Sequence, residues 1–198
     1  MFLRWRNRSS CSMGYKGVNK MKSVLISIKP RWCELIANGK KTIEVRKTRP
    51  KIETPFKCYI YCTKQSDIFT NDAKLFLKKD ECNGKVIGEF VCDKINEHPY
   101  TERGYKRHFS DRVLSCVPEK EINEYGKGKT LYGWHISDLV IYDEPKELSE
   151  FVKPCIYGEE SERPCFTCEK SGYSASDMCI ECFNEITRPP QSWCYVEE

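Results

Sequence analysis

Residues 31–49 read RWCELIANGKKTIEVRKTR, and the pattern changes from helix to strand near the middle of this stretch. The first half has apolar residues at helical spacing, namely Trp32, Leu35 and Ile36. Pro30 stands where a helix can begin, and Gly39 stands where a helix usually ends. The second half alternates polar and β-branched side chains. The stretch therefore predicts a short helix, a turn at glycine and a strand.

Side chains alternate between the two faces of the predicted strand. One face has two apolar residues, Ile43 and Val45. The other face has three polar residues, Thr42, Glu44 and Arg46. Because the helix ends just before the strand begins, we expect Lys41 to lie in the same small region as the last two of these. As polar residues at the end of a strand, they are expected to contribute little to the stability of the core.

Four residues have the spacing G-x-K-x-x-E-x-R, namely Gly39, Lys41, Glu44 and Arg46. Together with an expected strand at Val24 to Ile28, this spacing resembles the signature of the ASCH domain, a member of the PUA-like β-barrel group. The resemblance extends from about Met21 to Phe151. It implies an α+β fold, with a PUA-like (ASCH) β-barrel of about five or six strands and short flanking helices.

The resemblance also implies a function associated with nucleic acids. The first hypothesis is a module that binds RNA or a nucleotide, such as one with a modified base. The second is a hydrolase acting on RNA or on an acylated or modified nucleoside, with Lys41 and Glu44 as catalytic residues. In the amidohydrolase relatives a threonine stands where this chain has Glu44, so the hydroxyl nucleophile is missing here. A solvated Lys-Glu-Arg cluster without function is the structural alternative.

Residues 130–142 (TLYGWHISDLVIY) predict a closing strand pair or one long bent strand. Gly133 permits a bulge or a close approach of another chain segment. The family resemblance places this strand beside the pocket, where Trp134 is a candidate for stacking on a base and His135 for carrying a proton. Substrate-binding candidates are therefore Arg46, Thr42, Trp134 and His135. The alternatives are a core tryptophan and a structural histidine.

Other segments predict the rest of the domain. Residues 56–63 alternate so that Cys58, Ile60 and Cys62 share one face, as small core residues do. Residues 85–93 are apolar on both faces and predict a central strand. Residues 118–125 predict a short helix, whereas residues 96–116 mix aromatic and cationic side chains without a clear period.

Composition indicates an ordinary globular protein with one domain and an appendage. The chain has 198 residues, a formal net charge of +4 and 39% hydrophobic residues. Residues 1–20 are interpreted as a disordered basic tail or as sequence upstream of the true start, and residues 21–152 as the ASCH-type domain. The sequence has neither a secretory signal nor an apolar run of the ~20 residues that a membrane span needs. We therefore expect a cytoplasmic protein without a membrane partner.

Thirteen cysteines are present, and the spacing of those near the C-terminus indicates a metal site. Two C-x-x-C pairs, Cys165 with Cys168 and Cys179 with Cys182, predict a structural Zn²⁺ site with four thiolates in residues 153–187. Cys155 is a fifth candidate ligand. This segment is also the surface for a protein partner under a third hypothesis, that of a non-catalytic interaction module. Residues 188–198 contain Trp193 and Tyr195, and we expect them to dock on the barrel.

Overall fold

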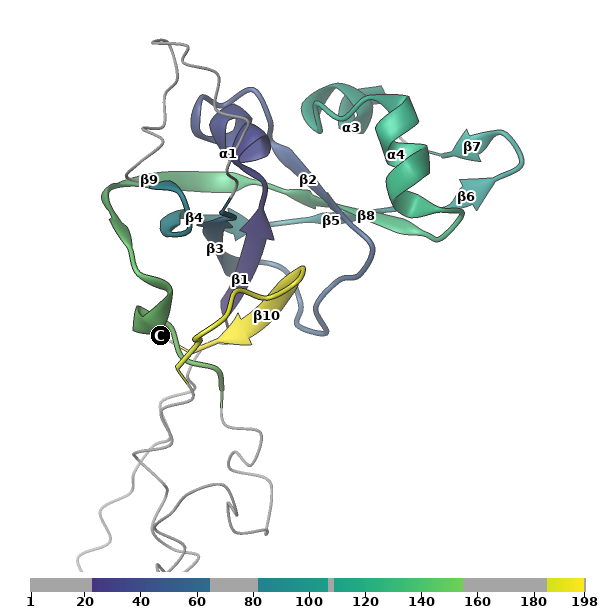
Figure 1. Ribbon diagram of the computed structural model, residues 1–198. Coiled ribbons are helices and arrows are strands. Elements are labelled where there is room, and N and C mark those ends of the chain that lie inside the picture. Colours follow the sequence, from purple (N-terminus) through teal and green to yellow (C-terminus); the bar gives the residue numbers. More distant parts are fainter. Residues whose placement is uncertain (1–22, 65–81, 107–108, 155–184, 198) are drawn as a thin grey trace, which may run out of the picture.

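The computed structural model describes residues 23–64, 82–106, 109–154 and 185–197. The largest sheet of the described residues has five strands, in the order β10 (Trp193–Val196), β1 (Ser23–Ile28), β3 (Phe56–Cys62), β4 (Val86–Cys92) and β9 (Ser137–Lys146) (Figure 1). A three-stranded sheet has the order β2 (Ile43–Arg46), β8 (Leu131–His135) and β5 (Ile95–His98). The hairpin of β6 (Tyr100–Thr101) and β7 (Gly104–Tyr105) completes the strands of the described ranges.

Few helices accompany these sheets. They are α1 (Pro30–Ala37), α3 (Phe109–Leu114), α4 (Glu119–Gly126) and the 3₁₀ helix η1 (Leu148–Glu150). The five-stranded sheet is mixed, because β1 and β3 are parallel while its other pairs are antiparallel. The fold is therefore of the α+β class, as expected. In the described residues, the strands expected to form the barrel are arranged in two hydrogen-bonded sheets. The two sheets share a core, because Trp134 of the three-stranded sheet packs with residues of the five-stranded sheet.

The helix and strand predicted from residues 31–49 are confirmed. Pro30 is the first residue of α1, after an extended Lys29 with φ −67° and ψ 145°. The helix ends at Ala37 with Asn38 as its C-cap, and Gly39 follows with φ +74°, a conformation in which a side chain would be strained. The backbone N–H of Lys41 then donates to the Leu35 carbonyl (2.8 Å), so the turn delivers the chain directly into β2.

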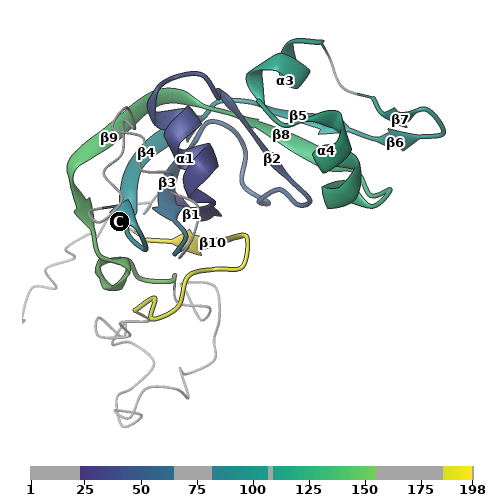
Figure 2. The ribbon, with the colours of Figure 1, turned by 45° about the horizontal axis from the view of Figure 1, so that its top comes forward.

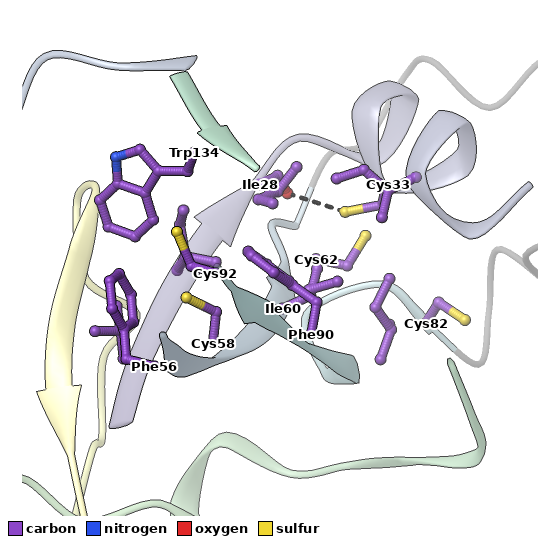
Figure 3. Packing of buried hydrophobic residues seen from close by; sticks show 14 residues of the cluster. Ile28, Cys33, Phe56, Cys58, Ile60, Cys62, Cys82, Phe90, Cys92 and Trp134 are labelled. Carbon is purple, nitrogen blue, oxygen red and sulfur yellow. Dashed lines mark hydrogen bonds between the residues drawn. The ribbon is translucent and has the colours of Figure 1, made fainter. Parts of the chain in front are cut away.

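The two faces predicted for β3 pack into two different buried clusters. Cys58, Ile60 and Cys62 belong to one buried cluster (Figure 3). Tyr59 and Tyr61 belong to a second cluster on the opposite face. These cysteines are free and buried, as the sequence pattern predicted. In the same cluster burial raises the pKa of the Cys92 thiol to about 12, so that it remains protonated at neutral pH.

Trp134 of β8 joins this core from the three-stranded sheet. Its ring packs edge to face on Phe56, with the centroids 5.8 Å apart (Figure 3). Gly133 beside it is required for close approach, because a Cβ there would lie 2.7 Å from His98 Nε2. The expected closing strand is accordingly a pair, with β8 in one sheet and β9 in the other.

Residues 96–116, which had no clear period, form β5, the β6–β7 hairpin and α3. The β6–β7 hairpin and α3 lie beside α4 at one end of the three-stranded sheet, to which β5 belongs (Figure 2). Each is short, so that tertiary contacts and not local periodicity determine its structure. Within the described ranges, no helix combines the length and the apolar character that a membrane span requires.

The C-terminal residues form part of the main sheet. Strand β10 pairs antiparallel with β1, Trp193 Nε1 donates to Thr48 Oγ1 (3.0 Å), and the backbone N–H of Lys51 donates to the Tyr195 hydroxyl (2.7 Å). Further upstream, Val152 forms a bridge with Glu185. The predicted zinc ligands lie outside the described residues, namely Cys165, Cys168, Cys179 and Cys182.

The pairing of β10 with β1 makes a prediction about stability, because the side chain of Val196 points into the core. Val196 is fully buried, whereas Val140 on β9 is 49% exposed. We expect Val196→Ala to lower the free energy of unfolding by about 2 kcal/mol, because the change removes apolar contacts and leaves a cavity. Val140→Ala is the matched control and should cost less than about 0.5 kcal/mol in urea denaturation. Equal effects of the two changes would contradict the docking of β10.

Candidate functional site

A cleft with a volume of about 940 Å³ lies between α1 and α4, above β2. Five cationic side chains line it: Lys29, Arg31, Lys41, Arg46 and Lys47. Three acidic side chains line it as well: Glu44, Glu121 and Glu124. Two aromatic rings, Trp32 and Tyr125, and the segment 189–192 complete much of the wall. The positive excess favours an anionic ligand.

Glu44 holds the charged residues of the cleft together. Its Oε2 lies 3.2 Å from Lys41 Nζ, and its Oε1 lies 3.0 Å from Arg46 Nη2. Lys41 is 1% exposed, Glu44 6% and Arg46 7%. The structure thus brings the three predicted residues together, as a buried network. They are not at an exposed strand end, and removal of one partner would leave an unpaired buried charge, so we expect such a change to lower stability.

All three ammonium hydrogens of Lys41 have acceptors. Nζ donates to the carbonyl oxygens of Ile43 (2.8 Å) and Ser115 (2.6 Å), and it pairs with Glu44 as described. The Trp32 ring lies below, with its centroid 5.1 Å from Nζ. The ammonium therefore ties the start of β2 to the residue that follows α3. To contact a ligand directly, it would have to give up one of these partners.

Arg46 retains an unused donor. Its Nη2 donates to the Ser27 carbonyl (2.6 Å) and pairs with Glu44. Its Nε is buried, and it has no hydrogen-bond partner among the described residues. A buried donor without a partner costs free energy, and a ligand acceptor in the cleft would remove that cost. Arg46, which also lines the cleft, is thus the network residue with a buried donor that the described residues do not satisfy.

The walls of the cleft combine cations with aromatic rings. Arg31 stacks on Trp32, with 4.1 Å between the guanidinium carbon and the ring centroid. Lys47 Nζ lies 4.6 Å from the centroid of the Tyr125 ring. Burial raises the pKa of the Tyr125 phenol, so its hydroxyl stays protonated and available as a donor at neutral pH. Such walls suit a planar ligand that also bears negative charge.

Three predicted substrate-binding residues lie away from the cleft lining. Thr42 is half-buried, and its backbone N–H donates to the Leu114 carbonyl (3.0 Å). Trp134 is a fully buried core residue and has no exposed ring face for stacking. His135 lies in a separate polar group, where Asn96 Nδ2 is 2.9 Å from His135 Nε2 and donates to Asp111 Oδ2 (2.8 Å). Of these candidates, only Arg46 lines the cleft.

Sequence reasoning missed several residues of the cleft. They are Lys29, Arg31, Trp32, Lys47, Glu121 and Tyr125. Trp32 was assigned only to the apolar stripe of its helix, and Tyr125 only to the end of another. Their shared role depends on the packing of α1 opposite α4, which are about ninety residues apart in the chain. The two cations that flank Pro30, Lys29 and Arg31, were a local signal of the site.

Comparison with known proteins gives a structural likeness only. No protein-family model matches the sequence, and no curated protein matches it. The structure is similar to the crystal structure of ASCH from Zymomonas mobilis, with a TM-score of 0.49 and 17% identity over 87% of this chain and 86% of that chain. Two mutant structures of the same protein match with a TM-score of 0.48 and 17% identity, and each covers 87% of this chain and 88% or 87% of its own.

The buried network makes a prediction about stability. We expect Lys41→Ala to lower the free energy of unfolding by about 3 kcal/mol, because it leaves Glu44 and two buried carbonyl groups without their donor. Lys40→Ala is the matched control, since Lys40 is the exposed neighbour of the same type. Denaturant unfolding followed by circular dichroism measures both. A loss for Lys41→Ala no larger than that of the control would show that the network is dispensable for folding.

Proposed function

We propose that this protein is an ASCH-type, PUA-like module that binds RNA or a nucleotide in the cleft between α1 and α4. The observation that carries the proposal is the buried Arg46 Nε, a donor without a partner in the described residues, in a cleft with more cations than anions. A phosphate oxygen or a polar atom of a base edge would satisfy this donor.

The aromatic walls support a nucleotide over a simple anion. Unstacked bases in single-stranded RNA are recognised by stacking on aromatic rings or on guanidinium planes, with hydrogen bonds to their edges. Trp32 with its stacked Arg31, and Tyr125 with Lys47, offer these surfaces next to cations. The cleft volume of about 940 Å³ is at the upper end of ordinary small-ligand pockets, which are roughly 300–1,000 Å³. It therefore has room for a nucleotide.

The hydrolase hypothesis receives less support from this geometry. A catalytic role for Lys41 requires its ammonium to release at least one of three short contacts. Glu44 is likewise engaged by a cation on each carboxylate oxygen. Both residues are better suited to positioning Arg46. A binding module is therefore the function that we propose first.

We also propose that the protein is cytoplasmic and holds a structural Zn²⁺ through Cys165, Cys168, Cys179 and Cys182. The support for zinc is the spacing of the two C-x-x-C pairs, which suits a tetrahedral thiolate site. The described residues that precede and follow the cysteine-rich segment are close together, because the Ile186 N–H donates to the Phe151 carbonyl (3.0 Å). The expected result is about one zinc per chain after purification without added metal, and Cys168→Ser with Cys182→Ser should abolish it. Absence of zinc from the parent protein would refute this proposal.

Binding measurements test the main proposal. We expect Lys47→Ala to weaken binding of single-stranded RNA. The slope of the logarithm of affinity against the logarithm of salt concentration should become shallower by about 1, which corresponds to the loss of one phosphate contact. Lys51→Ala is the matched control, because Lys51 is exposed in the same loop but does not line the cleft. Equal effects of the two changes would indicate a diffuse charge effect and contradict binding in the cleft.

Arg46→Lys tests the specific donor. Lysine keeps the positive charge but lacks Nε, so we expect affinity for RNA or nucleotide to fall at least about tenfold, the value of one charge-assisted hydrogen bond. The melting temperature of the variant is measured in parallel, and binding is compared at a temperature where both proteins are folded. Incubation of the parent with RNA and with modified nucleosides, followed by chromatography of products, decides between the reader and the hydrolase.

A further inference from the structure

An ion pair connects α1 and α4, the two helices that border the cleft. Arg31 of α1 contacts Glu121 of α4 through both arms of its fork, with Nη1 donating to Oε1 (3.5 Å) and Nη2 donating to Oε2. Both side chains are accessible, with exposed fractions of 48% and 37%. Both also line the cleft. This contact therefore joins the two walls through side chains that solvent and a ligand can reach.

The surroundings of Arg31 favour an anion. The guanidinium carbon lies over the Trp32 ring, 4.1 Å from its centroid. Lys29, which also lines the cleft, is the N-cap residue of α1. The first turn of α1 has no acidic residue that would neutralise the positive end of the helix dipole. Only Glu121, from the opposite wall, supplies the negative charge that the fork contacts in the described part of the chain.

A carboxylate and a phosphate are interchangeable partners for such a fork. The planar guanidinium offers parallel N–H groups that match two oxygens of either anion. An ion pair between exposed side chains is worth only about 0–1 kcal/mol, so exchange of one anion for another costs little. A phosphate also brings more negative charge than a carboxylate to the neighbouring Lys29.

We propose that Arg31 forms the phosphate-binding subsite of the cleft, and that Glu121 occupies its fork until the phosphate of the ligand replaces it. This inference rests on the proposed function, since it names the position of the phosphate in the same cleft. Glu121 is then a specificity-determining residue. Its ion pair with Arg31 must break before a phosphate can bind there, and the free energy of that ion pair reduces the affinity for every ligand that bears a phosphate. A nucleoside without phosphate leaves the ion pair intact.

The test compares two changes of equal charge on the same helix. Glu121→Gln removes the competitor of the phosphate, whereas Glu124→Gln removes a negative charge that also lines the cleft from α4. The probes are the common ribonucleosides, their 5′-monophosphates, inorganic phosphate and a single-stranded RNA oligonucleotide, measured by calorimetry. We expect Glu121→Gln to tighten binding of monophosphates and RNA by about two- to fivefold, the range of an exposed ion pair. Glu124→Gln should tighten it less, and neither change should affect nucleosides.

A double variant separates pairing from general electrostatics. In an Arg31→Ala background, where the fork is absent, Glu121→Gln should no longer differ from Glu124→Gln. Equal gains for the two glutamine variants in the parent background would overturn the subsite at Arg31 while leaving binding in the cleft intact. Failure of the parent to bind any probe would instead overturn the proposed function. A gain with RNA but not with monophosphates would identify a backbone phosphate, and not a terminal one, as the group at Arg31.

Discussion

The carboxylate of Glu44 is the contact on which the site depends. Through Lys41 it is linked to the Ser115 carbonyl after α3, and through Arg46 it is linked to the Ser27 carbonyl at the end of β1. Three segments distant in sequence therefore meet at one buried anion. A buried charge of this kind is tolerated only when its partners are present, so the arrangement specifies the geometry more than it adds stability.

The same network explains why Nε of Arg46 is buried without a hydrogen-bond partner in the described residues. Two cations surround one carboxylate, so the cluster carries an excess positive charge. Lys41 has exhausted its donors, and Nη2 of Arg46 has two acceptors, which leaves Nε of Arg46 without one in the described residues. A group that the fold already holds in place costs little reorganisation if a ligand binds it. The residues that hold the fold here are therefore also those that prepare the site.

The sequence predicted local features well and distant contacts poorly. Proline, glycine and alternation located α1, the turn at Gly39 and the faces of β2 and β3, because each depends on neighbours in the chain. Trp134 was ambiguous, since an aromatic residue on a strand has the same pattern whether it packs in a core or faces a ligand. Similarly, Tyr125 and Glu121 became site residues only because α4 packs opposite α1. No periodicity within either helix encodes that packing.

Ser27 connects the charged network to the C-terminal wall of the cleft. Its carbonyl accepts from Arg46, its N–H donates to the Ser192 carbonyl (2.9 Å), and its hydroxyl donates to the Pro190 carbonyl (2.6 Å). One buried residue thus fixes both the guanidinium and the segment 189–192 that lines the cleft. Because linkage is reciprocal, a ligand that binds Arg46 better when this wall is in place must also stabilise the wall. Under the proposed function, a ligand at Arg46 would therefore be coupled to the contacts of Ser27 with the segment that precedes β10.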